Sequence, residues 1–446
     1  MTTITLRQAR RMLEGVIPPV MCSVSADGVP HVNYLSQAEY VDDRHIALTF
    51  QFFNRSRQNV LATGRVALGV DDPYTGSSVV MQLRYLRTET SGPVFERLRA
   101  KLAGIAAQTG MEKVFKLQGA DLYEVLELQR VDLDHPLPGL QPRCDVAAGA
   151  RTLGQQIAEC ADMAALLETT LDGLQRHLRI RHAILWMLDE RAASLYTLAS
   201  RGYATSGVGA EMALADSGLA GVAVREGVPI RIGHMSQAYA YGMATRERAR
   251  EAGLAEAMRR EIPLPGLATP RSQLAVPLRA RGRSVGALLV ESDSDQFFSY
   301  DDEDALALLC GQLAAALASL QAQEMEADVA AASAPPAAPT GPARRVRHYA
   351  RDDSVFIDDE YLIKGVAGAI FWKLVREFVH HGRSEFSTRE LRLAADELRL
   401  PEVQDNLGVR LLLLERRLAE RGGPVLIERA GRGRFRLRVQ QALTLA

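Results

Sequence analysis

The residues best placed to bind a charged ligand lie in FQFFNRSRQNV, residues 50–60. A predicted strand ends there in aromatic residues, and Asn54, Ser56, Arg57 and Asn59 then crowd the start of a short predicted helix. Backbone N–H groups at a helix start, together with a hydroxyl and a guanidinium, suit a phosphate monoester. Taken alone, the segment fits a polar helix cap with one solvated arginine better.

No other group of residues has the spacing of a catalytic or metal site. The four cysteines are far apart and show no CxxC spacing, so reduced thiols are expected rather than a disulfide scaffold or a zinc site. His234 follows a predicted strand but has no His or Cys partner at metal spacing. The sequence therefore names no catalytic residue and no metal ligand.

Chain length and charge limit the number of domains and the kinds of partner. A chain of 446 residues is expected to form two to four domains. Lys and Arg (53) nearly cancel Asp and Glu (54), so any attraction to nucleic acid has to be local. The N-terminal MTTITLRQARRML carries charge where a signal peptide needs an apolar run, and no apolar stretch reaches the roughly 18–20 residues of a membrane span. We expect a soluble cytoplasmic protein.

Residues 1–135 read as short strands with turns, for example at Asp27-Gly28, and one late helix over 93–108. This order predicts a small β-barrel. The stretches GVPHVNYLSQAEYVDDRHIALTF, FNRSRQNVLATGRVALGV and VVMQLRYLRTETSG resemble the FMN-binding split barrel of the pyridoxamine 5'-phosphate oxidase-like superfamily. The resemblance covers roughly 120 residues and implies FMN as cofactor and a homodimer that shares the site.

That resemblance also implies positions for the FMN contacts. The phosphate would fall to Asn54, Ser56 and Arg57 at the strand-to-helix corner. Residues flanking the flavin ring or reaching the same pocket would be Ser36, Gln37, Gln51, Phe53, Gln82 and Arg84.

The sequence departs from the oxidase at the end of the barrel. The superfamily's oxidase carries an Arg-x-His element there, whereas this chain has YEVLELQRVDLDHPLPG, in which Arg130 and His135 are too far apart. We therefore expect flavin binding without the pyridoxal reaction. A barrel that is empty or has another use is the alternative.

The middle of the chain, residues 150–322, follows a proline-rich linker, HPLPGLQPRC. SGLAGVAVREGVPIRI predicts a short helix ended by Gly227 and then a strand, and SQLAVPLRARGRSVGALLVES predicts a β-hairpin. In this order, together with FFSYDDEDALALLCGQLAAAL, these segments resemble the GAF domain, a small-molecule-sensing and dimerisation module. The resemblance implies an antiparallel sheet with flanking helices and a ligand of unknown identity.

A polar insert, residues 238–270, lies where such a ligand would be covered. Tyr239 and Tyr241 could stack on a planar ligand, but RERAREAGLAEAMRRE also fits a solvated helix with alternating charge, which is the stronger interpretation. The predicted helix over 301–327 has leucines at 306, 309, 313, 317 and 320. Their spacing fits either a parallel two-helix contact or packing on the domain's own sheet.

Residues 323–346 are rich in Ala and Pro and predict a spacer, so the last unit, 347–446, is expected to be tethered rather than tightly packed. That unit predicts three helices and a β-hairpin, a winged helix-turn-helix. DNLGVRLLLLERRLAERGGPVLIERAGRGRFRLRV resembles the DNA-binding effector domain of response regulators. The resemblance places Arg410, Arg416 and Arg417 on a recognition helix, and Arg432 and Arg434 on a wing that would meet DNA phosphate or the minor groove. Because LLLLE leaves few polar side chains to read bases, protein contact is the alternative.

Together these patterns predict a multidomain α+β protein with a split β-barrel, a GAF domain and a winged helix. The favoured function is a transcriptional regulator that senses a flavin or a small molecule and binds DNA. An FMN-dependent oxidoreductase with regulatory modules is the second hypothesis. The third is an interaction protein whose modules have no ligands.

Overall fold

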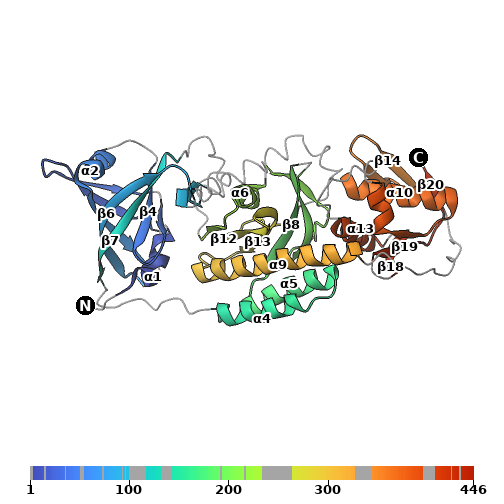
Figure 1. Ribbon diagram of the computed structural model, residues 1–446, viewed down its shortest axis with the longest axis horizontal. Helices are drawn as coiled ribbons and strands as arrows, with labels where there is room; N and C mark the ends of the chain where they lie inside the picture. The colour runs from blue at the N-terminus through green and yellow to red at the C-terminus, as the bar shows by residue number, and fades with distance from the viewer. Residues whose placement is uncertain are drawn as a thin grey trace.

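A computed structural model describes residues 4–14, 17–35, 37–50, 55–72, 75–92, 94–95, 97–99, 117–131, 143–190, 193–214, 217–233, 264–326, 343–394, 407–422, 424–430 and 433–446. Three units lie in a row along the long axis, in the order of the sequence (Figure 1). An N-terminal sheet stands at one end, a sheet with long helices lies in the middle, and a smaller α+β unit stands at the other end.

The N-terminal unit is a seven-stranded antiparallel sheet in the order β2-β1-β5-β6-β7-β4-β3. Its elements are α1 (Leu6–Ala9), η1 (Arg10–Glu14), β1 (Val20–Val24), β2 (Pro30–Tyr34), β3 (Ala38–Tyr40), β4 (His45–Phe50), α2 (Arg55–Thr63), β5 (Arg65–Asp71), β6 (Ser78–Glu89) and β7 (Gly119–Val131). Burial alternates along β1 and β5, because successive side chains of a strand point to opposite faces. The strands predicted from period-two patterning are present, whereas most of the helix predicted over 93–108 lies outside the described residues.

The middle unit is a six-stranded antiparallel sheet in the order β10-β9-β8-β13-β12-β11. Its strands are β8 (His182–Asp189), β9 (Ser194–Arg201), β10 (Glu211–Ala213), β11 (Ile230–Ile232), β12 (Ser272–Ala280) and β13 (Arg283–Ser292). The predicted hairpin is β12–β13, and it turns at Gly282, whose φ of +81° is left-handed.

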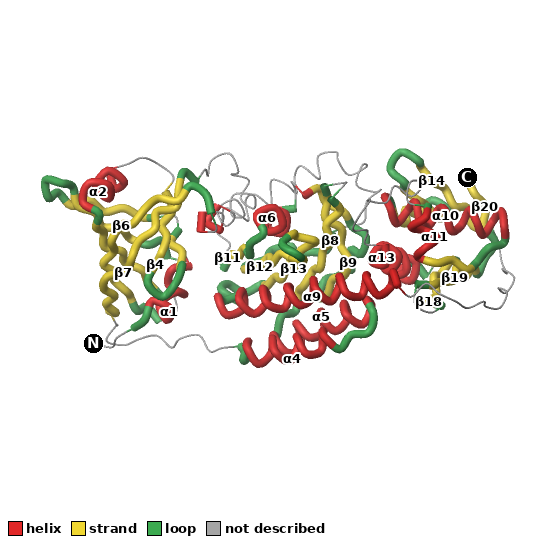
Figure 2. Tube along the Cα trace, viewed as in Figure 1, coloured by secondary structure: helices red, strands yellow, loops and turns green. Residues whose placement is uncertain are grey.

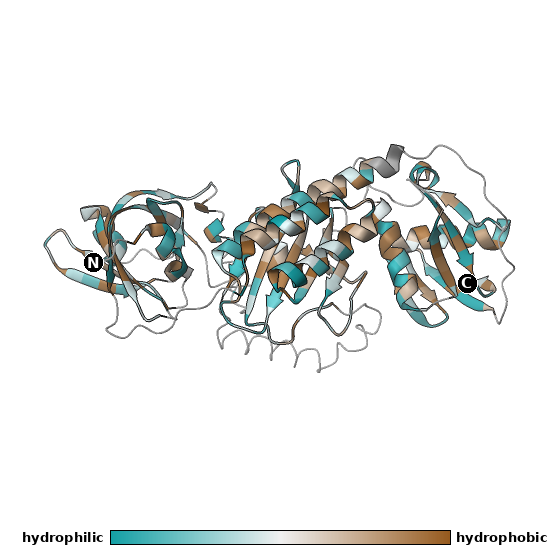
Figure 3. Cartoon of the chain, turned by 90° about the horizontal axis from the view of Figure 1, so that it is seen from below, coloured by the Kyte–Doolittle hydropathy of each residue, from teal (hydrophilic) through white to brown (hydrophobic). Residues whose placement is uncertain are grey.

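Helices cover both faces of this sheet (Figure 2). The helices α4 (Val146–Ala158), α5 (Met163–Leu178) and α9 (Tyr300–Glu326) share one hydrophobic core with one face, and α6 (Gly218–Glu226) packs on the other. Gly227 ends α6 with φ of +69°, as its position in the sequence predicts. Hydrophobic residues run along the strands and the facing helix sides (Figure 3).

The leucine series of α9 packs within the chain. All five leucines are buried in the core that α9 shares with α4, α5 and the sheet. Of the two expectations for these leucines, the structure therefore has packing on the domain's own sheet. By length and composition alone Tyr300–Ala322 could also cross a membrane, but core helices of soluble proteins have the same character.

In its described residues the C-terminal unit combines two small sheets with three helices. Its elements are β14 (Arg344–Tyr349), β15 (Ser354–Ile357), β16 (Glu360–Ile363), α10 (Gly365–His381), β17 (Glu385–Ser387), α11 (Thr388–Leu393), α13 (Leu407–Glu420), β18 (Val425–Arg429), β19 (Arg434–Val439) and β20 (Leu443–Leu445). The sheets are ordered β16-β15-β14-β20 and β17-β19-β18. The sequence predicted β15, β16 and the β18–β19 hairpin but not β14 or β20, which pair in parallel although they are far apart in the chain.

The C-terminal unit is not merely tethered, which corrects the expectation from the Ala/Pro-rich segment. One continuous cluster of buried residues runs from the middle unit into the C-terminal unit, and α13 contacts α5 while α11 contacts α9. Composition predicts a spacer because it reports on the segment between two units. It carries no information on whether the faces of those units fit one another.

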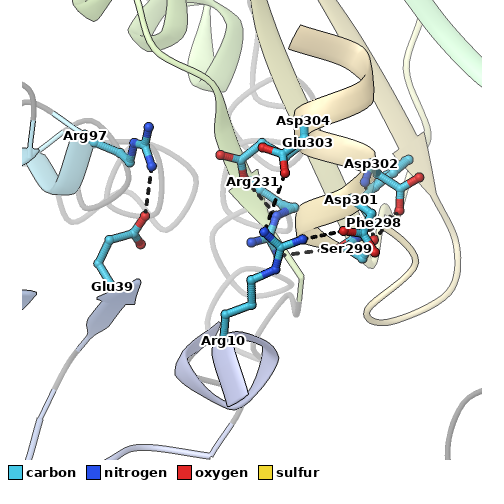
Figure 4. Close-up of polar contacts among 10 residues, drawn as sticks. All are labelled: Arg10, Glu39, Arg97, Arg231, Phe298, Ser299, Asp301, Asp302, Glu303 and Asp304. Carbon is cyan, nitrogen blue, oxygen red and sulfur yellow. Dashed lines mark hydrogen bonds and ion pairs between the residues drawn. The ribbon is translucent and has the colours of Figure 1, made fainter. Parts of the chain in front are cut away.

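A second junction joins the N-terminal unit to the start of α9. Arg10 of η1 pairs with Asp301 and lies 3.5 Å from Asp304 (Figure 4). Its guanidinium lies 5.1 Å from the centre of the Tyr300 ring. Arg231 of β11 lies over the same ring at 4.2 Å. Acidic residues in a first helical turn are favourable with the helix dipole, and here they also receive a cation from another unit.

Candidate functional site

The proposed phosphate corner of the N-terminal unit is described from residue 55 onward. Arg57 projects from α2 and pairs with Asp121 of β7, and it also donates to Thr88 Oγ1 at 2.5 Å. The side chains of Arg57 and Asp121 are only 10% and 7% exposed. Burial raises the pKa of the Asp121 carboxyl, and the bonds from Thr88 and Arg57 offset only part of that rise.

The hydroxyl and amide groups of α2 are also engaged. Ser56 donates to Asn33 Oδ1 at 2.9 Å, and Asn59 donates to Ser23 Oγ at 3.1 Å. Ser56 is 1% exposed. The side chains of Ser56, Arg57 and Asn59 are thus engaged within the chain, and Arg57 already has a carboxylate as its counter-ion. They do not fit an FMN phosphate in this arrangement.

The residues predicted to flank the flavin ring differ in exposure and in their partners. Gln82 is exposed on β6, and Arg84 pairs with Glu124 of β7. Gln37 has a buried Oε1 without a hydrogen-bond partner among the described residues, so it is an open acceptor. The predicted positions Ser36, Gln51, Phe53, Asn54, Tyr239, Tyr241 and Arg432 lie outside the described residues.

The α6 face of the middle sheet carries a buried carboxylate, Glu291 of β13. Its Oε1 accepts from Gln273 Nε2 at 2.5 Å, and its Oε2 accepts from the Tyr203 hydroxyl at 2.8 Å and the Leu267 backbone N–H at 3.0 Å. Burial and the neighbouring Glu291 raise the pKa of Tyr203. Glu291 therefore ties the described end of the insert, at Leu267, to the sheet.

A cleft of about 1270 Å³ lies between η1, the start of α4 and the start of α9. Arg10, Arg11 and Arg143 line it, and each pairs with a carboxylate of the chain. Within the described part of the chain, no group of three or more His, Cys, Asp or Glu side chains could hold a metal ion.

The arginines predicted for a recognition helix do not face outward. Arg410 of α13 pairs with Asp189 of β8, and its guanidinium lies 3.8 Å from the centre of the Tyr196 ring. Arg416 lies 3.3 Å from Glu168 of α5, and Arg417 donates to Leu362 O at 3.1 Å within its own unit. In this arrangement α13 is a contact helix between two units, and its role in binding DNA stays a prediction.

On the predicted wing, Arg434 is half-buried on β19, where it pairs in register with Ser387 of β17. Its neighbour Arg436 pairs with Glu385 at 2.6 Å, and Arg438 pairs with Glu428 at 2.9 Å. Acidic cross-strand partners thus reduce the positive charge of this face.

Sequence reasoning missed the carboxylates that complete these sites. Asp121, Asp189 and Glu291 each stand in a predicted strand, where an isolated acidic residue is usually solvated. The available signal was an acidic residue inside an otherwise apolar strand, as in SVGALLVES. It indicates burial with a partner, but it does not name the partner.

Residues 160–318 match the GAF domain family, so the middle unit is a GAF domain, which indicates small-molecule sensing or regulation. No curated protein matches the chain. Similar solved structures include the GAF domain of an Acinetobacter phosphoenolpyruvate-protein phosphotransferase, at 22% identity over 40% of this chain and 94% of that one (TM-score 0.31). The free methionine-R-sulfoxide reductase of Neisseria meningitidis is similar at 18% identity over 40% of this chain and 90% of that one (TM-score 0.30). An FMN-binding protein from Syntrophomonas wolfei is similar at 17% identity over 28% of this chain and 86% of that one (TM-score 0.25).

Proposed function

We propose that this protein is a transcriptional regulator in which the GAF domain binds a small molecule and thereby controls a C-terminal winged helix that binds DNA. The observation that supports this most directly is the buried pairing of Arg410 with Asp189. It couples the helix that would read DNA to the first strand of the sensor domain. A ligand that changes the GAF sheet would therefore act on α13 through a direct contact.

The chemistry of the middle unit favours sensing over catalysis. Its buried carboxylate Glu291 is paired with Gln273, Tyr203 and the Leu267 backbone N–H. Of its cysteines, Cys310 is buried in the core, where burial raises the pKa of the thiol, so it does not form a nucleophilic thiolate readily. The proposal therefore assigns this domain a binding role.

A binding assay tests the regulator proposal. The full chain is incubated with a pool of random-sequence duplex DNA and with a metabolite library, and retained duplexes are sequenced. We expect at least one metabolite to change duplex retention, and the retained pool to share a motif. The proposal would be contradicted if the retained duplexes shared no motif and no metabolite changed the amount retained.

FMN as cofactor of the N-terminal unit, within a split-barrel homodimer, is a separate proposal. Its support is the sequence resemblance and the open acceptor of Gln37, and the pairing of Arg57 with Asp121 stands against it. A visible absorbance spectrum of the purified protein decides whether the N-terminal unit binds FMN. A flavin spectrum would bring the FMN-dependent oxidoreductase back as an alternative function, to be tested by turnover of NAD(P)H.

A further inference from the structure

The surfaces that meet between the GAF domain and the C-terminal unit have opposite charge. On the GAF side stand Asp189 at the end of β8, Glu168 on α5 and Glu211 on β10. On the C-terminal side stand Arg410 and Arg416 of α13 and Lys364, the residue before α10. They form three cross-unit pairs: Arg410 with Asp189, Arg416 with Glu168 at 3.3 Å, and Lys364 with Glu211 at 3.8 Å.

Burial singles out one of these pairs. The side chains of Arg410 and Asp189 are 8% and 13% exposed, whereas Glu168 is 58% exposed. The Tyr196 ring closes the site from the GAF sheet. Burial by itself would lower the pKa of Arg410, but Tyr196, Asp189 and Glu211 together hold it above its ordinary value. The arginine stays charged, so once α13 leaves this surface its guanidinium has lost Asp189 as a partner and can pair with another anion.

Helical spacing places the docked residues on one face of α13. Arg410, Leu413, Arg416 and Glu420 recur at intervals of three and four, and Glu420 accepts from Ser206 of the GAF domain at 2.5 Å. Arg417 donates to Leu362 O of its own unit and lies 3.2 Å from Glu420. The cations of α13 are thus divided between the GAF domain and the unit's own small sheet.

We propose that the acidic surface of the GAF domain, formed by Asp189, Glu168 and Glu211, occupies the basic face of α13 in the place of nucleic-acid phosphates. The C-terminal unit then binds a polyanion only after α13 has left this surface. This inference rests on the proposed DNA-binding function and states how DNA binding is inhibited while α13 is docked. Because both surfaces belong to one chain, the carboxylates compete at a high effective concentration.

The GAF sheet offers a route from a ligand to this contact. On β9, Tyr196 belongs to the core cluster on the docking side, whereas its neighbour Leu195 belongs to the cluster around α6. Trp186 of β8 donates to Thr197 Oγ1 at 3.0 Å, which fixes the two strands to one another. A ligand bound against the α6 face would move strands that carry both Tyr196 and Asp189.

The test neutralises two of the three GAF carboxylates and leaves α13 unchanged. The full chain with Asp189→Asn and Glu168→Gln is compared with the wild type and with Asp293→Asn, an exposed carboxylate between β13 and α9. Binding to a fluorescent random-sequence duplex is measured by anisotropy, and release of α13 by amide hydrogen exchange. We expect faster exchange in α13 and duplex affinity higher by roughly tenfold or more, with no change in the control.

The outcomes separate the two proposals. Unchanged exchange in α13, or faster exchange with a duplex affinity that is measurable but unchanged, would overturn the inference. Faster exchange with no binding to duplex or heparin would instead sink the DNA-binding function, and with it the claim that a polyanion is displaced. A charge swap, Asp189→Arg with Arg410→Asp, guards against misfolding, because slow exchange should return in the swapped protein if the pair holds the two units together.

Discussion

Several charged residues of this protein form ion pairs that join one element or unit to another. Arg57 with Asp121 joins α2 to β7, Arg410 with Asp189 joins two units, and Arg231 with Glu303 joins β11 to α9. Such pairs add little net stability compared with apolar residues, but removal of one partner is expensive. They therefore fix a particular arrangement more than they stabilise it.

The pairing of Arg57 makes a residue-scale prediction. Replacement of Asp121 by Ala leaves the guanidinium buried beside Thr88 and Tyr85, so the free energy of unfolding of the N-terminal unit should fall by about 3–5 kcal/mol. Chemical denaturation of the full chain measures this loss. Glu127→Ala, an exposed position on the same strand, is the matched control and should change stability by well under half as much. Equal losses would show that Arg57 finds another partner.

At the scale of elements, a residue has to suit both the local helix or strand and the atoms that pack against it. Gly286 of β13 faces the backbone of Trp186 so closely that a Cβ would overlap its carbonyl oxygen, whereas Gly311 of α9 has open space around it. Both glycines lie in regular elements, and the sequence does not distinguish them.

The two glycines therefore predict opposite effects. Gly311→Ala should raise the stability of the GAF domain by about 0.5–1 kcal/mol, because alanine loses less backbone entropy in a helix. Gly286→Ala should lower it by roughly 1–3 kcal/mol through overpacking. Thermal unfolding of both variants beside the wild type measures the two shifts. A Gly286→Ala variant as stable as the wild type would contradict the close packing of β13 on β8.

The start of α11 carries a second element-scale prediction. Ser387 Oγ accepts from Glu390 N at 3.2 Å, and Glu390 Oε2 accepts from Ser387 N at 3.1 Å, which is a capping box. Ser387→Ala should destabilise the C-terminal unit by about 1 kcal/mol, and Ser387→Asp should restore most of that loss. Chemical denaturation of the full chain is a suitable readout, and no rescue by Asp would argue against the cap.

At the scale of the whole molecule, two charged junctions hold three units in a row. The junction at Arg10 connects the N-terminal unit to the start of α9, and the junction at Arg410 connects α13 to the GAF sheet at the other end. Because α9 spans the GAF domain and α11 contacts it, one helix lies between the two junctions (Figure 1). The middle domain is therefore positioned to affect both neighbours.

The Arg10 junction predicts a change in molecular dimensions. Arg10→Glu places a negative charge against Asp301 and Asp304, so the N-terminal unit should leave α9 and the radius of gyration from small-angle scattering should increase. Arg7→Glu, an exposed position on the adjacent α1, is the control and should leave the dimensions unchanged. An unchanged radius in both variants would show that other contacts hold the junction.

The sequence by itself determined many of the strands and helices and the middle domain. Period-two patterns predicted the strands of the first sheet, and Gly227 and the β12–β13 hairpin identified the order of a GAF domain, because these signals are local in the chain. Only the tertiary structure decided which carboxylate each arginine meets. Arg57 and Arg410 read as ligand-binding cations from their neighbours in sequence, yet their partners, Asp121 and Asp189, are 64 and 221 positions away. An ion pair depends on the distance between two charges in the folded chain, and the local sequence around an arginine does not show which carboxylate folding brings within a few ångströms.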